Sequence, residues 1–156
     1  MRPEALDSDD ARALIAQLDD HLRALYPPED NFFSLEASEV DGTRGVFLVA
    51  RVRGVAVGCG AVRLRSPFTG EIKRMFVAST HRGRGVGHVV LDELEAWARR
   101  AGAQHLVLET GPHQDEAIAL YERCGFTPIP CFGEYVHSGS SICYGKDLTD
   151  AGTADP

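Results

Sequence analysis

The first part of the chain carries apolar residues at helical spacing. They would lie on one face of a helix, and they are Leu14, Ile15, Leu18, Leu22 and Leu25. Ser8 precedes two acidic residues, which suits a helix start because a hydroxyl caps the first turn and acids favour the positive end of the dipole. Two prolines at 27–28 end this helix. The pattern predicts a helix over residues 8–25, then loop or a short second helix over residues 29–44.

Apolar runs of strand length dominate the next part of the chain. Residues 46–52 and 55–64 are rich in valine, and Arg53-Gly54 separates them. They read as two antiparallel strands joined by a tight turn. Residues 66–70 contain serine, proline and glycine, which favour a break. The next predicted strand covers residues 71–77.

A long amphipathic helix is predicted after the glycine-rich junction at residues 83–87. Its apolar stripe consists of Val90, Leu91, Leu94, Trp97, Ala98 and Ala101. Two arginines in the last turn, followed by Gly102, suit the end of a helix. A strand over residues 104–110 follows, so residues 71–110 have the order strand, helix, strand. That order predicts a parallel pair of strands with a right-handed crossover.

The remaining elements complete one mixed α/β domain. A second helix is predicted over residues 114–124, with short final strands at 126–127 and 142–146. Neither an internal repeat nor a linker interrupts the chain. We therefore predict a single domain over residues 1–149, followed by a frayed polar tail over residues 150–156.

Composition and charge exclude several classes of function. The chain has 156 residues, of which 44 % are apolar, as expected for one globular domain. Its net charge of -7 makes nucleic acid a poor partner, because an acidic surface repels phosphates. No segment reaches the ~20 apolar residues of a membrane helix. The first residues also lack the apolar run of a secretory signal.

The cysteines show no metal-binding pattern. Cys59, Cys124, Cys131 and Cys143 form no C-x-x-C pair and lack zinc-ligand spacing with histidine. We predict that all four are small core residues with free thiols, and that the protein holds no metal. Free thiols indicate a reducing cytoplasm.

A glycine-rich segment before the amphipathic helix is the most informative part of the sequence. Gly83, Gly85 and Gly87 let the backbone approach a ligand without obstruction by side chains. The first helical turn has N–H groups without partners, which together with the helix dipole suit a phosphate. Arg82 and Arg84 add positive charge. The segment therefore predicts an anion site.

Two common phosphate-binding motifs do not fit this segment. A P-loop needs Gly-Lys followed by Ser or Thr, and the segment has neither. A dinucleotide fingerprint, G-x-G-x-x-G, would place the third glycine one residue later. These differences disfavour a dinucleotide-dependent oxidoreductase. A turn that merely starts a helix remains an alternative from the residues alone.

Two motifs in sequence order identify a family resemblance. Arg82-x-x-Gly85-x-Gly87 resembles the R/Q-x-x-G-x-G/A motif of the GNAT superfamily of N-acetyltransferases. Residues 117–126 resemble the A-x-x-L-Y-x-x-x-G-F helix of that family, and residues 71–77 its fourth strand. Residues 130–135 and 141–146 are similar to a bacterial branch of small members. The resemblance implies an α/β (α+β) fold with a mixed, mostly antiparallel sheet, a central parallel strand pair and flanking helices.

The resemblance implies acetyl-CoA as acyl donor. The pyrophosphate would lie on N–H groups of residues 82–88, and the pantetheine arm would run beside residues 75–77, where two strands of the family splay apart. The implied binding residues are Met75, Phe76, Val77, Arg82, Gly83, Arg84, Gly85, Val86, Gly87, His88, Gln114 and Tyr121. A backbone N–H on this strand, expected at Phe76, would hydrogen-bond the thioester oxygen and stabilise the developing oxyanion.

Two side chains are candidates for the chemistry. Tyr121 matches the family tyrosine near the CoA sulfur, and a phenol stays protonated at neutral pH and can donate. Glu71 is the candidate base, or orders a water that acts as base, and Glu109 on the neighbouring strand is its competitor. Without the resemblance, spacing alone favours Tyr121 as a core residue, and a solvated charge at a strand end accounts equally well for Glu71.

The chain also departs from the family pattern. Gln114 stands where the family usually has asparagine, so its amide would reach the pantetheine differently. Ser79 replaces a common proline after the fourth strand, and the family's first strand is barely visible in residues 2–6. These differences affect the edges of the site more than the implied function.

The acceptor is expected to be an amine of a small molecule or a peptide. Loop residues that would rim the acceptor side are Tyr26, Glu36, Phe132, Glu134 and Tyr135. Acids and aromatics there would suit a cationic amine, although ordinary loop packing accounts for each of them equally well. The resemblance is compatible with a homodimer. A catalytically silent acyl-CoA-binding sensor is the alternative function.

Overall fold

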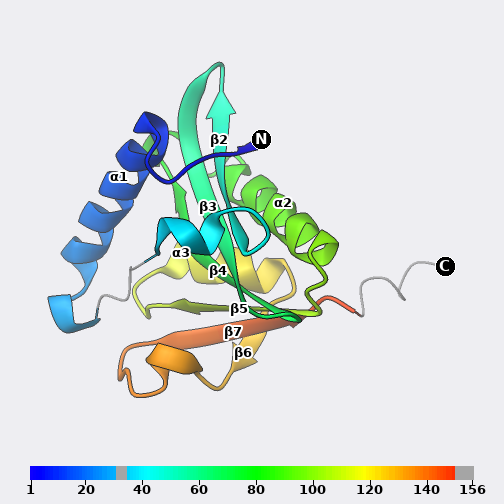
Figure 1. The fold of residues 1–156 in the computed structure, drawn as a ribbon. Coiled ribbons are helices and arrows are strands. Elements are labelled where there is room, and N and C mark those ends of the chain that lie inside the picture. Colours follow the sequence, from blue (N-terminus) through cyan, green and yellow to red (C-terminus); the bar gives the residue numbers. More distant parts are fainter. Residues whose placement is uncertain (31–34, 150–156) are drawn as a thin grey trace.

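The computed structural model describes residues 1–30 and 35–149, which form one seven-stranded sheet with helices on both faces (Figure 1). The strands are β1 (Arg2–Pro3), β2 (Gly45–Val52), β3 (Val55–Ser66), β4 (Thr69–Val77), β5 (His105–Thr110), β6 (Thr127–Ile129) and β7 (Ile142–Asp147). The α-helices are α1 (Asp9–Leu25), α2 (Val86–Arg100) and α3 (Asp115–Arg123). Short 3₁₀ turns are η1 (Pro28–Asp30), η2 (Ala37–Val40), η3 (Ser79–His81) and η4 (Gly133–Tyr135).

The strand order β1-β2-β3-β4-β5-β7-β6 confirms the predicted fold class. Neighbouring strands run antiparallel except β4 and β5, which form the predicted parallel pair. Segment 29–44 contributes only the turns η1 and η2 within its described part. The strand predicted at 126–127 is β6, which begins at residue 127. The predicted tail at 150–156 lies outside the described residues.

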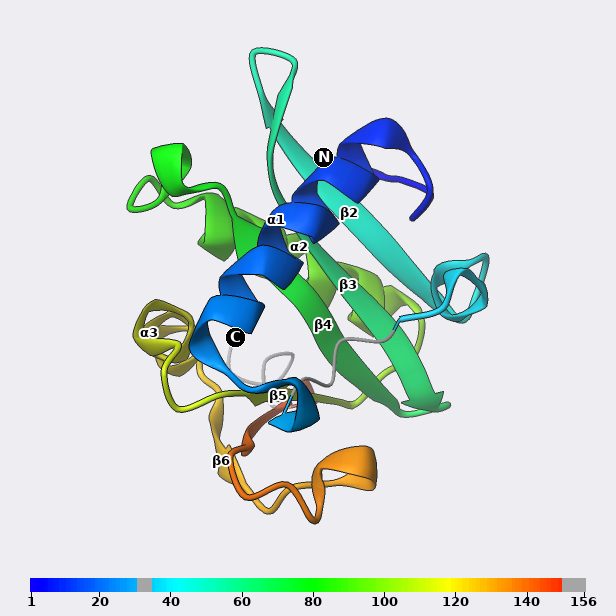
Figure 2. The ribbon, with the colours of Figure 1, turned by 90° about the vertical axis from the view of Figure 1, so that its left-hand side faces the viewer.

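Each face of the sheet carries its own apolar core. On one face α1 packs on the sheet through Ala11, Leu14, Leu18, Leu22, Phe47, Val49, Cys59, Ala61 and Phe76. On the other face α2 packs through Val90, Leu91, Leu94, Ala98, Val46, Leu48, Val62, Ile72, Leu106 and Leu108. Figure 2 shows α1 in front of β2, β3 and β4, with α2 behind them.

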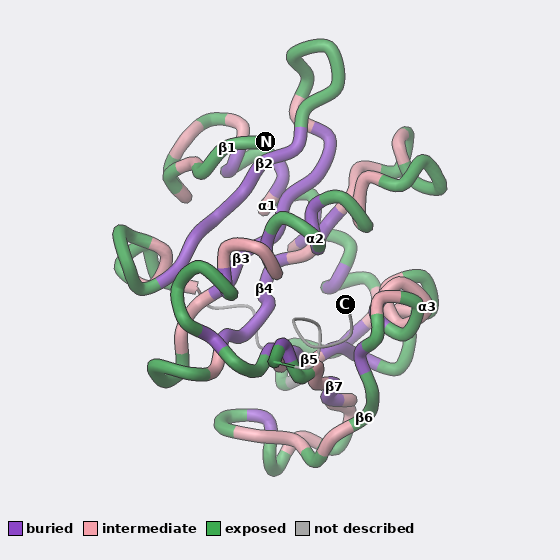
Figure 3. The backbone as a smooth tube through the Cα atoms, turned by 90° about the vertical axis from the view of Figure 1, so that its right-hand side faces the viewer, coloured by how far each residue is buried: buried purple, intermediate pink, exposed green. Residues whose placement is uncertain are grey.

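Because helices cover both faces, β2 carries a continuous apolar run over residues 46–50. Strand β2 is buried from residue 45 to residue 50, because alternate side chains enter the two cores. Figure 3 shows the buried stretches along β2, β3 and β4 and the exposed tip of the β2–β3 hairpin. None of the helices among the described residues is both long and apolar enough to cross a lipid bilayer.

The parallel pair separates before either strand ends. Pairing of β4 with β5 begins at Thr69 and His105 and stops at Ile72 and Leu108. Strand β4 continues to Val77 and β5 to Thr110 without further pairing to each other. Beyond this point the facing backbone edges of β4 and β5 do not pair with each other, as the family resemblance implied.

The prediction of four free cysteines is wrong for two of them. Cys131 and Cys143 form a disulfide, with their Cα atoms 5.2 Å apart. Pairing of β6 with β7 sets Ile129 opposite Cys143, so the chain just after β6 passes within bonding range. Cys59 and Cys124 are free. Two of the four thiols on which the expectation of a reducing compartment rested are therefore not free.

Candidate functional site

The glycine-rich segment forms the turn that leads into α2. Gly83 and Gly85 have φ angles of 78° and 84°, a left-handed conformation that costs an L-residue roughly 1–2 kcal/mol. A Cβ atom at either position would meet nothing within 4 Å, so backbone conformation, not lack of space, requires glycine. Gly85 is the N-cap of α2. The N–H groups of the first turn therefore face the space in front of the helix.

Arg82 is held against the strand that precedes the turn. Its Nε donates to the Val77 carbonyl oxygen at 2.9 Å, and its guanidinium lies 5.6 Å from the centre of the Phe76 ring. Arg84 is exposed on the same turn. One arginine therefore fixes the turn on β4, while the other adds positive charge at the surface.

The third glycine serves a different purpose from the first two. A Cβ at Gly87 would lie 3.1 Å from a methyl group of Leu120, so glycine allows α2 and α3 to pack closely. His88 follows, and its Nδ1 lies 3.3 Å from the Cys124 sulfur of the α3 C-terminus. Close packing of the two helices sets the width of the space between them.

A groove of about 830 Å³ opens in front of the turn. The end of β4, the glycine turn, the start of α2 and α3 form its walls. Among the lining residues are Met75, Phe76, Val77, Arg82, Gly83, Gly85, Val86, Gly87, His88, Gln114 and Tyr121. The structure thus brings together all the predicted coenzyme-binding residues except Arg84, which is not part of the lining.

Strand β4 is bulged where it borders the groove. Two steps along β3, from residue 59 to 61, span three steps of β4, from 76 to 73. Arg74 in the bulge has a φ of 59°, which is strained for a residue other than glycine. Its guanidinium is paired with Asp19 of α1, and the Cys59 thiol donates to its carbonyl oxygen at 3.3 Å. Contacts with α1 and β3 therefore hold the bulge.

The backbone of β4 beyond the bulge presents donors to the groove. The Ala78 N–H donates to the Val57 carbonyl oxygen of β3 at 2.8 Å. In an antiparallel pair, backbone N–H groups of successive residues point to alternate sides. The N–H of Phe76, two residues before Ala78, therefore also points toward β3. The N–H groups of Met75 and Val77 face the opposite side, from which β5 has separated. This geometry favours Met75 and Val77 over Phe76 as donors to a ligand.

A smaller cavity of about 80 Å³ lies beside the groove, on the face covered by α1. Its polar lining includes Tyr26, Glu71, Lys73, Glu109, Tyr121 and Tyr135. Leu18, Met75, Gln114 and Tyr121 line both spaces, so the two spaces meet there. Met75 and Tyr121 therefore stand at the junction of a long groove and a polar cavity.

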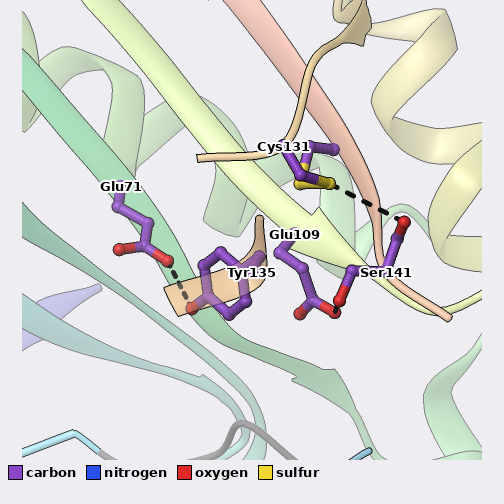
Figure 4. The surroundings of a disulfide bond; sticks show 6 residues. Glu71, Glu109, Cys131, Tyr135 and Ser141 are labelled. Carbon is purple, nitrogen blue, oxygen red and sulfur yellow. Dashed lines mark hydrogen bonds between the residues drawn. A yellow bond between two sulfur atoms is a disulfide. The ribbon is translucent and has the colours of Figure 1, made fainter. Parts of the chain in front are cut away.

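Both carboxylate oxygens of Glu71 accept hydrogen bonds from neighbouring side chains. Its carboxylate is almost completely buried, and one oxygen accepts from Arg63 at 2.9 Å and from Arg65 at 2.7 Å. The other oxygen accepts from the Tyr135 hydroxyl at 2.7 Å (Figure 4). A general base needs a free lone pair within reach of the substrate proton. These contacts favour a structural role for Glu71 over the predicted role as base.

Glu109 is less constrained and faces the same cavity. The Ser141 hydroxyl donates to one of its oxygens at 2.7 Å (Figure 4). Burial raises the pKa of Glu109, and the Ser141 hydrogen bond and the charge of Lys73 only partly oppose the rise. A carboxyl with a raised pKa can exchange protons nearer neutral pH. Glu109 is thus the better placed of the two candidate bases.

Tyr121 on α3 separates the cavity from the groove. The ring is buried and packs edge-on against Phe126, with ring centres 5.9 Å apart. Within the described part of the chain its hydroxyl has no hydrogen-bond partner. Burial and the nearby Glu109 raise the pKa of Tyr121. The phenol therefore stays protonated and keeps its O–H for a ligand.

The predicted rim of the acceptor side divides into two groups. Tyr26 and Tyr135 line the small cavity, whereas Glu36, Phe132 and Glu134 do not. The Tyr26 hydroxyl accepts from the backbone N–H of residue 113 at 3.0 Å. Two arginines of β3 bind Glu134, and one of them lies over the Phe132 ring. Packing between loop and sheet thus accounts for Phe132 and Glu134.

Three charged residues near the cavity were not predicted from the sequence: Arg63, Arg65 and Lys73. Strands β3 and β4 pair with Arg63 opposite Glu71. Alternate positions on the two strands then place both arginines, Glu71 and Lys73 on one face of the sheet. Pairing the two predicted strands across the turn at 66–70 would have placed these opposite charges beside each other.

Comparisons with known proteins agree with this geometry. A family model described as "Acetyltransferase (GNAT) family" matches residues 11–126. An "IAA acetyltransferase" of Azospirillum brasilense is 44 % identical over 137 residues, which make up 86 % of this chain and 88 % of the relative. The match therefore covers most of both proteins.

Solved structures show the same fold. A Klebsiella pneumoniae structure described as an acyl-CoA N-acyltransferase has a TM-score of 0.81 and 35 % identity, covering 94 % of this chain and 95 % of that chain. A GNAT family acetyltransferase from Elizabethkingia anophelis with acetyl-CoA bound has a TM-score of 0.67 and 18 % identity. It covers 94 % of this chain and 96 % of its own, and at that identity it supports the fold alone.

The structural role of Glu71 can be tested by neutralising it. We expect Glu71→Gln to lower the free energy of unfolding by about 3 kcal/mol, because Arg63 and Arg65 lose their buried partner. Glu134→Gln is the matched control, since its side chain is 42 % exposed and the loss should stay below about 1 kcal/mol. Chemical denaturation measures both. A Glu71→Gln protein as stable as the parent but inactive would return Glu71 to the chemistry.

Proposed function

Since the chain belongs to the GNAT family of acetyltransferases, we propose that it binds acetyl-CoA in the groove and transfers the acetyl group directly to an amine. The acceptor is an amine of a small molecule or peptide. One observation carries the proposal: the groove in front of the glycine turn and the polar cavity meet at Met75 and Tyr121. A thioester at this junction is reachable from both spaces.

The glycine turn binds the pyrophosphate of the coenzyme. The first-turn N–H groups of α2 and the positive end of its dipole favour an anion. Gly83 and Gly85 hold the backbone in the left-handed conformation that exposes these groups. Exposed Arg84 adds charge beside them, in a protein whose net charge is otherwise negative.

The unpaired edge of β4 binds the pantetheine arm. The N–H groups of Met75 and Val77 face the side from which β5 has separated, so an extended ligand can pair with them as an added strand. One of these donors, at Met75, lies at the junction with the cavity and stabilises the oxyanion as the thioester carbonyl is attacked.

Proton transfers balance across the junction. The amine nitrogen forms the new C–N bond, and the C–S bond of the thioester breaks. Glu109 accepts the proton that the attacking nitrogen loses, and the Tyr121 hydroxyl donates a hydrogen bond to the departing sulfur. The proton on Glu109 then passes through solvent to the CoA thiolate. The products are the acetylated amine and the free thiol of CoA.

Tyr121 acts chiefly as a hydrogen-bond donor. Burial raises its pKa, whereas an ordinary thiol has a pKa of about 8.5. Complete transfer of the phenol proton to a thiolate is therefore uphill, but a hydrogen bond still stabilises the charge that forms on sulfur. The final proton can then come from solvent.

A thiol-release assay tests the proposed function. Acetyl-CoA is incubated with the protein and a panel of amino acids, polyamines, aminoglycosides and peptides, and free CoA thiol is measured. We expect at least one amine to accelerate thiol release well above hydrolysis. Calorimetric binding of acetyl-CoA without acceleration by any amine would instead identify a catalytically silent acyl-CoA sensor.

The coenzyme site can be tested at the glycine turn. Gly85→Ala should weaken CoA binding roughly tenfold, because alanine in the left-handed conformation costs about 1–2 kcal/mol. Calorimetry with CoA measures the change. Gly139→Ala is the control, since Gly139 has an ordinary φ and no atom within 4 Å of an added Cβ. Equal affinity of both variants for CoA would place the coenzyme elsewhere.

Removal of the Tyr121 hydroxyl should slow the chemistry without affecting coenzyme binding. We expect Tyr121→Phe to lower kcat roughly 10²-fold, with an unchanged KM for acetyl-CoA. Tyr144→Phe is a matched control, because this buried hydroxyl bonds Glu122 at 3.0 Å and lines neither space. A normal kcat in Tyr121→Phe would leave that residue as core packing.

The proposed base predicts a specific dependence on pH. Because burial raises the Glu109 pKa, kcat/KM should fall as pH falls through a value above the usual ~4.3 of glutamate. Below that pH the carboxyl is protonated and accepts no proton. Glu109→Gln should lower kcat/KM and abolish this acidic limb, while exposed Glu93→Gln keeps it. Persistence of the limb in Glu109→Gln would assign the titration to another group.

A further inference from the structure

Lys73 is a buried cation without an ion-pair partner among the described residues. Lys73 is 8 % exposed and lines the small cavity. Within the same part of the chain its Nζ forms one hydrogen bond, to the Tyr135 hydroxyl at 3.3 Å. An ammonium carries three donors, so two of them have no protein acceptor there. Burial lowers the pKa of Lys73, as expected for a cation removed from water.

The other cations near the cavity already have anionic partners. Arg63 and Arg65 bind Glu71 on the cavity wall. Arg74 is paired with Asp19 of α1. Among the charges that line the cavity, Lys73 and Glu109 thus remain outside any ion pair of the described residues.

These two groups lie opposite each other across the gap between the strands. The parallel register sets Glu71 beside Val107 and Ile72 beside Leu108. One further step sets Lys73 level with Glu109, where the strands begin to separate. Both positions fall on the face that carries Glu71 and the small cavity, because Ile72 and Leu108 enter the opposite core. A buried cation and a buried carboxyl therefore flank one small space.

We infer that the acceptor is an amino acid, with its carboxylate on Lys73 and its amine on Glu109. The inference rests on the proposed function and names the class of acceptor for that site. A zwitterionic head group places an opposite charge against each protein group, so both buried charges gain a direct ion-pair partner. The cavity of about 80 Å³ suits a compact head group.

The arrangement also orients the attacking nitrogen. Lys73 holds the carboxylate on the β4 side of the cavity, and Glu109 holds the amine on the β5 side. The amine then faces Glu109. One proton of the ammonium passes through Glu109 to solvent before the nitrogen attacks the thioester carbon, and Glu109 accepts a second proton from that nitrogen as the C–N bond forms. Charge-assisted contacts at both ends of the head group fix its direction.

The test compares amino acids with partners that lack the carboxylate. Thiol release from saturating acetyl-CoA is measured with each common L-amino acid, its amide and its decarboxylated amine. We expect kcat/KM for the preferred amino acid to exceed that for its amide by roughly 10- to 100-fold, the effect of one charged hydrogen bond. Lys73→Met should remove this preference, because it lowers kcat/KM for the amino acid, which loses its cationic partner, by more than it lowers kcat/KM for the amide.

Lys146→Met provides the matched control. Lys146 is also partly buried, with Nζ bonded to Glu95 at 2.7 Å and to the Cys124 carbonyl oxygen at 2.8 Å, but it lies outside the cavity. This variant should keep the preference. Calorimetry of the amino acid with the CoA-bound protein gives a readout apart from turnover, and Lys73→Met should weaken that binding to a similar degree.

The outcomes separate this inference from the proposed function. Equal rates with an amino acid and its amide, or a preference that survives Lys73→Met, would overturn the inference and leave the acetyltransferase intact. Acetyl-CoA binding without turnover of any amine would overturn the proposed function, and the inference with it. A preference lost only in Lys73→Met would support both.

Discussion

The early separation of β4 from β5 is the constraint on which the site depends. The two strands pair over four positions and then separate, which leaves backbone N–H groups on β4 without a neighbouring strand. The bulge at Arg74 turns these groups toward the groove, and the strained conformation persists because Asp19 and Cys59 bind it from either side. The same gap holds the cavity. One departure from regular pairing thus creates a place for an extended ligand and a place for its reaction partner.

A network of charges keeps the wall of this gap rigid. Glu71 gathers Arg63, Arg65 and the Tyr135 hydroxyl, and Tyr135 in turn contacts Lys73. The loop before β7 is thereby fastened to the central strands, so the cavity keeps its shape without relying on apolar contacts alone. Because these groups satisfy one another, the network leaves only Lys73 and Glu109 with charges that face the cavity and lack an ion-pair partner among the described residues.

The features predicted from sequence are those encoded over short distances. Apolar spacing located the helices, and the glycines at 83 and 85 indicated the anion turn, because a few consecutive residues determine each of them. The contact of Glu71 with Tyr135 was not predicted, because the two residues are 64 positions apart in the sequence. The disulfide between Cys131 and Cys143 was missed for a related reason, since it depends on the register of β6 with β7. Spacing along the chain does not reveal contacts that strand order creates.

The two outer strands of the sheet have a consequence for how molecules of this protein meet. One edge is Arg2–Pro3 and the other is Thr127–Ile129, which contains Pro128. Proline has no N–H to donate, and such short segments offer little template for another strand. Growth of the sheet into a second molecule, the usual first step toward fibrous aggregation, is therefore disfavoured at both ends. Contacts between copies would then rely less on the two outer strands than on other surfaces.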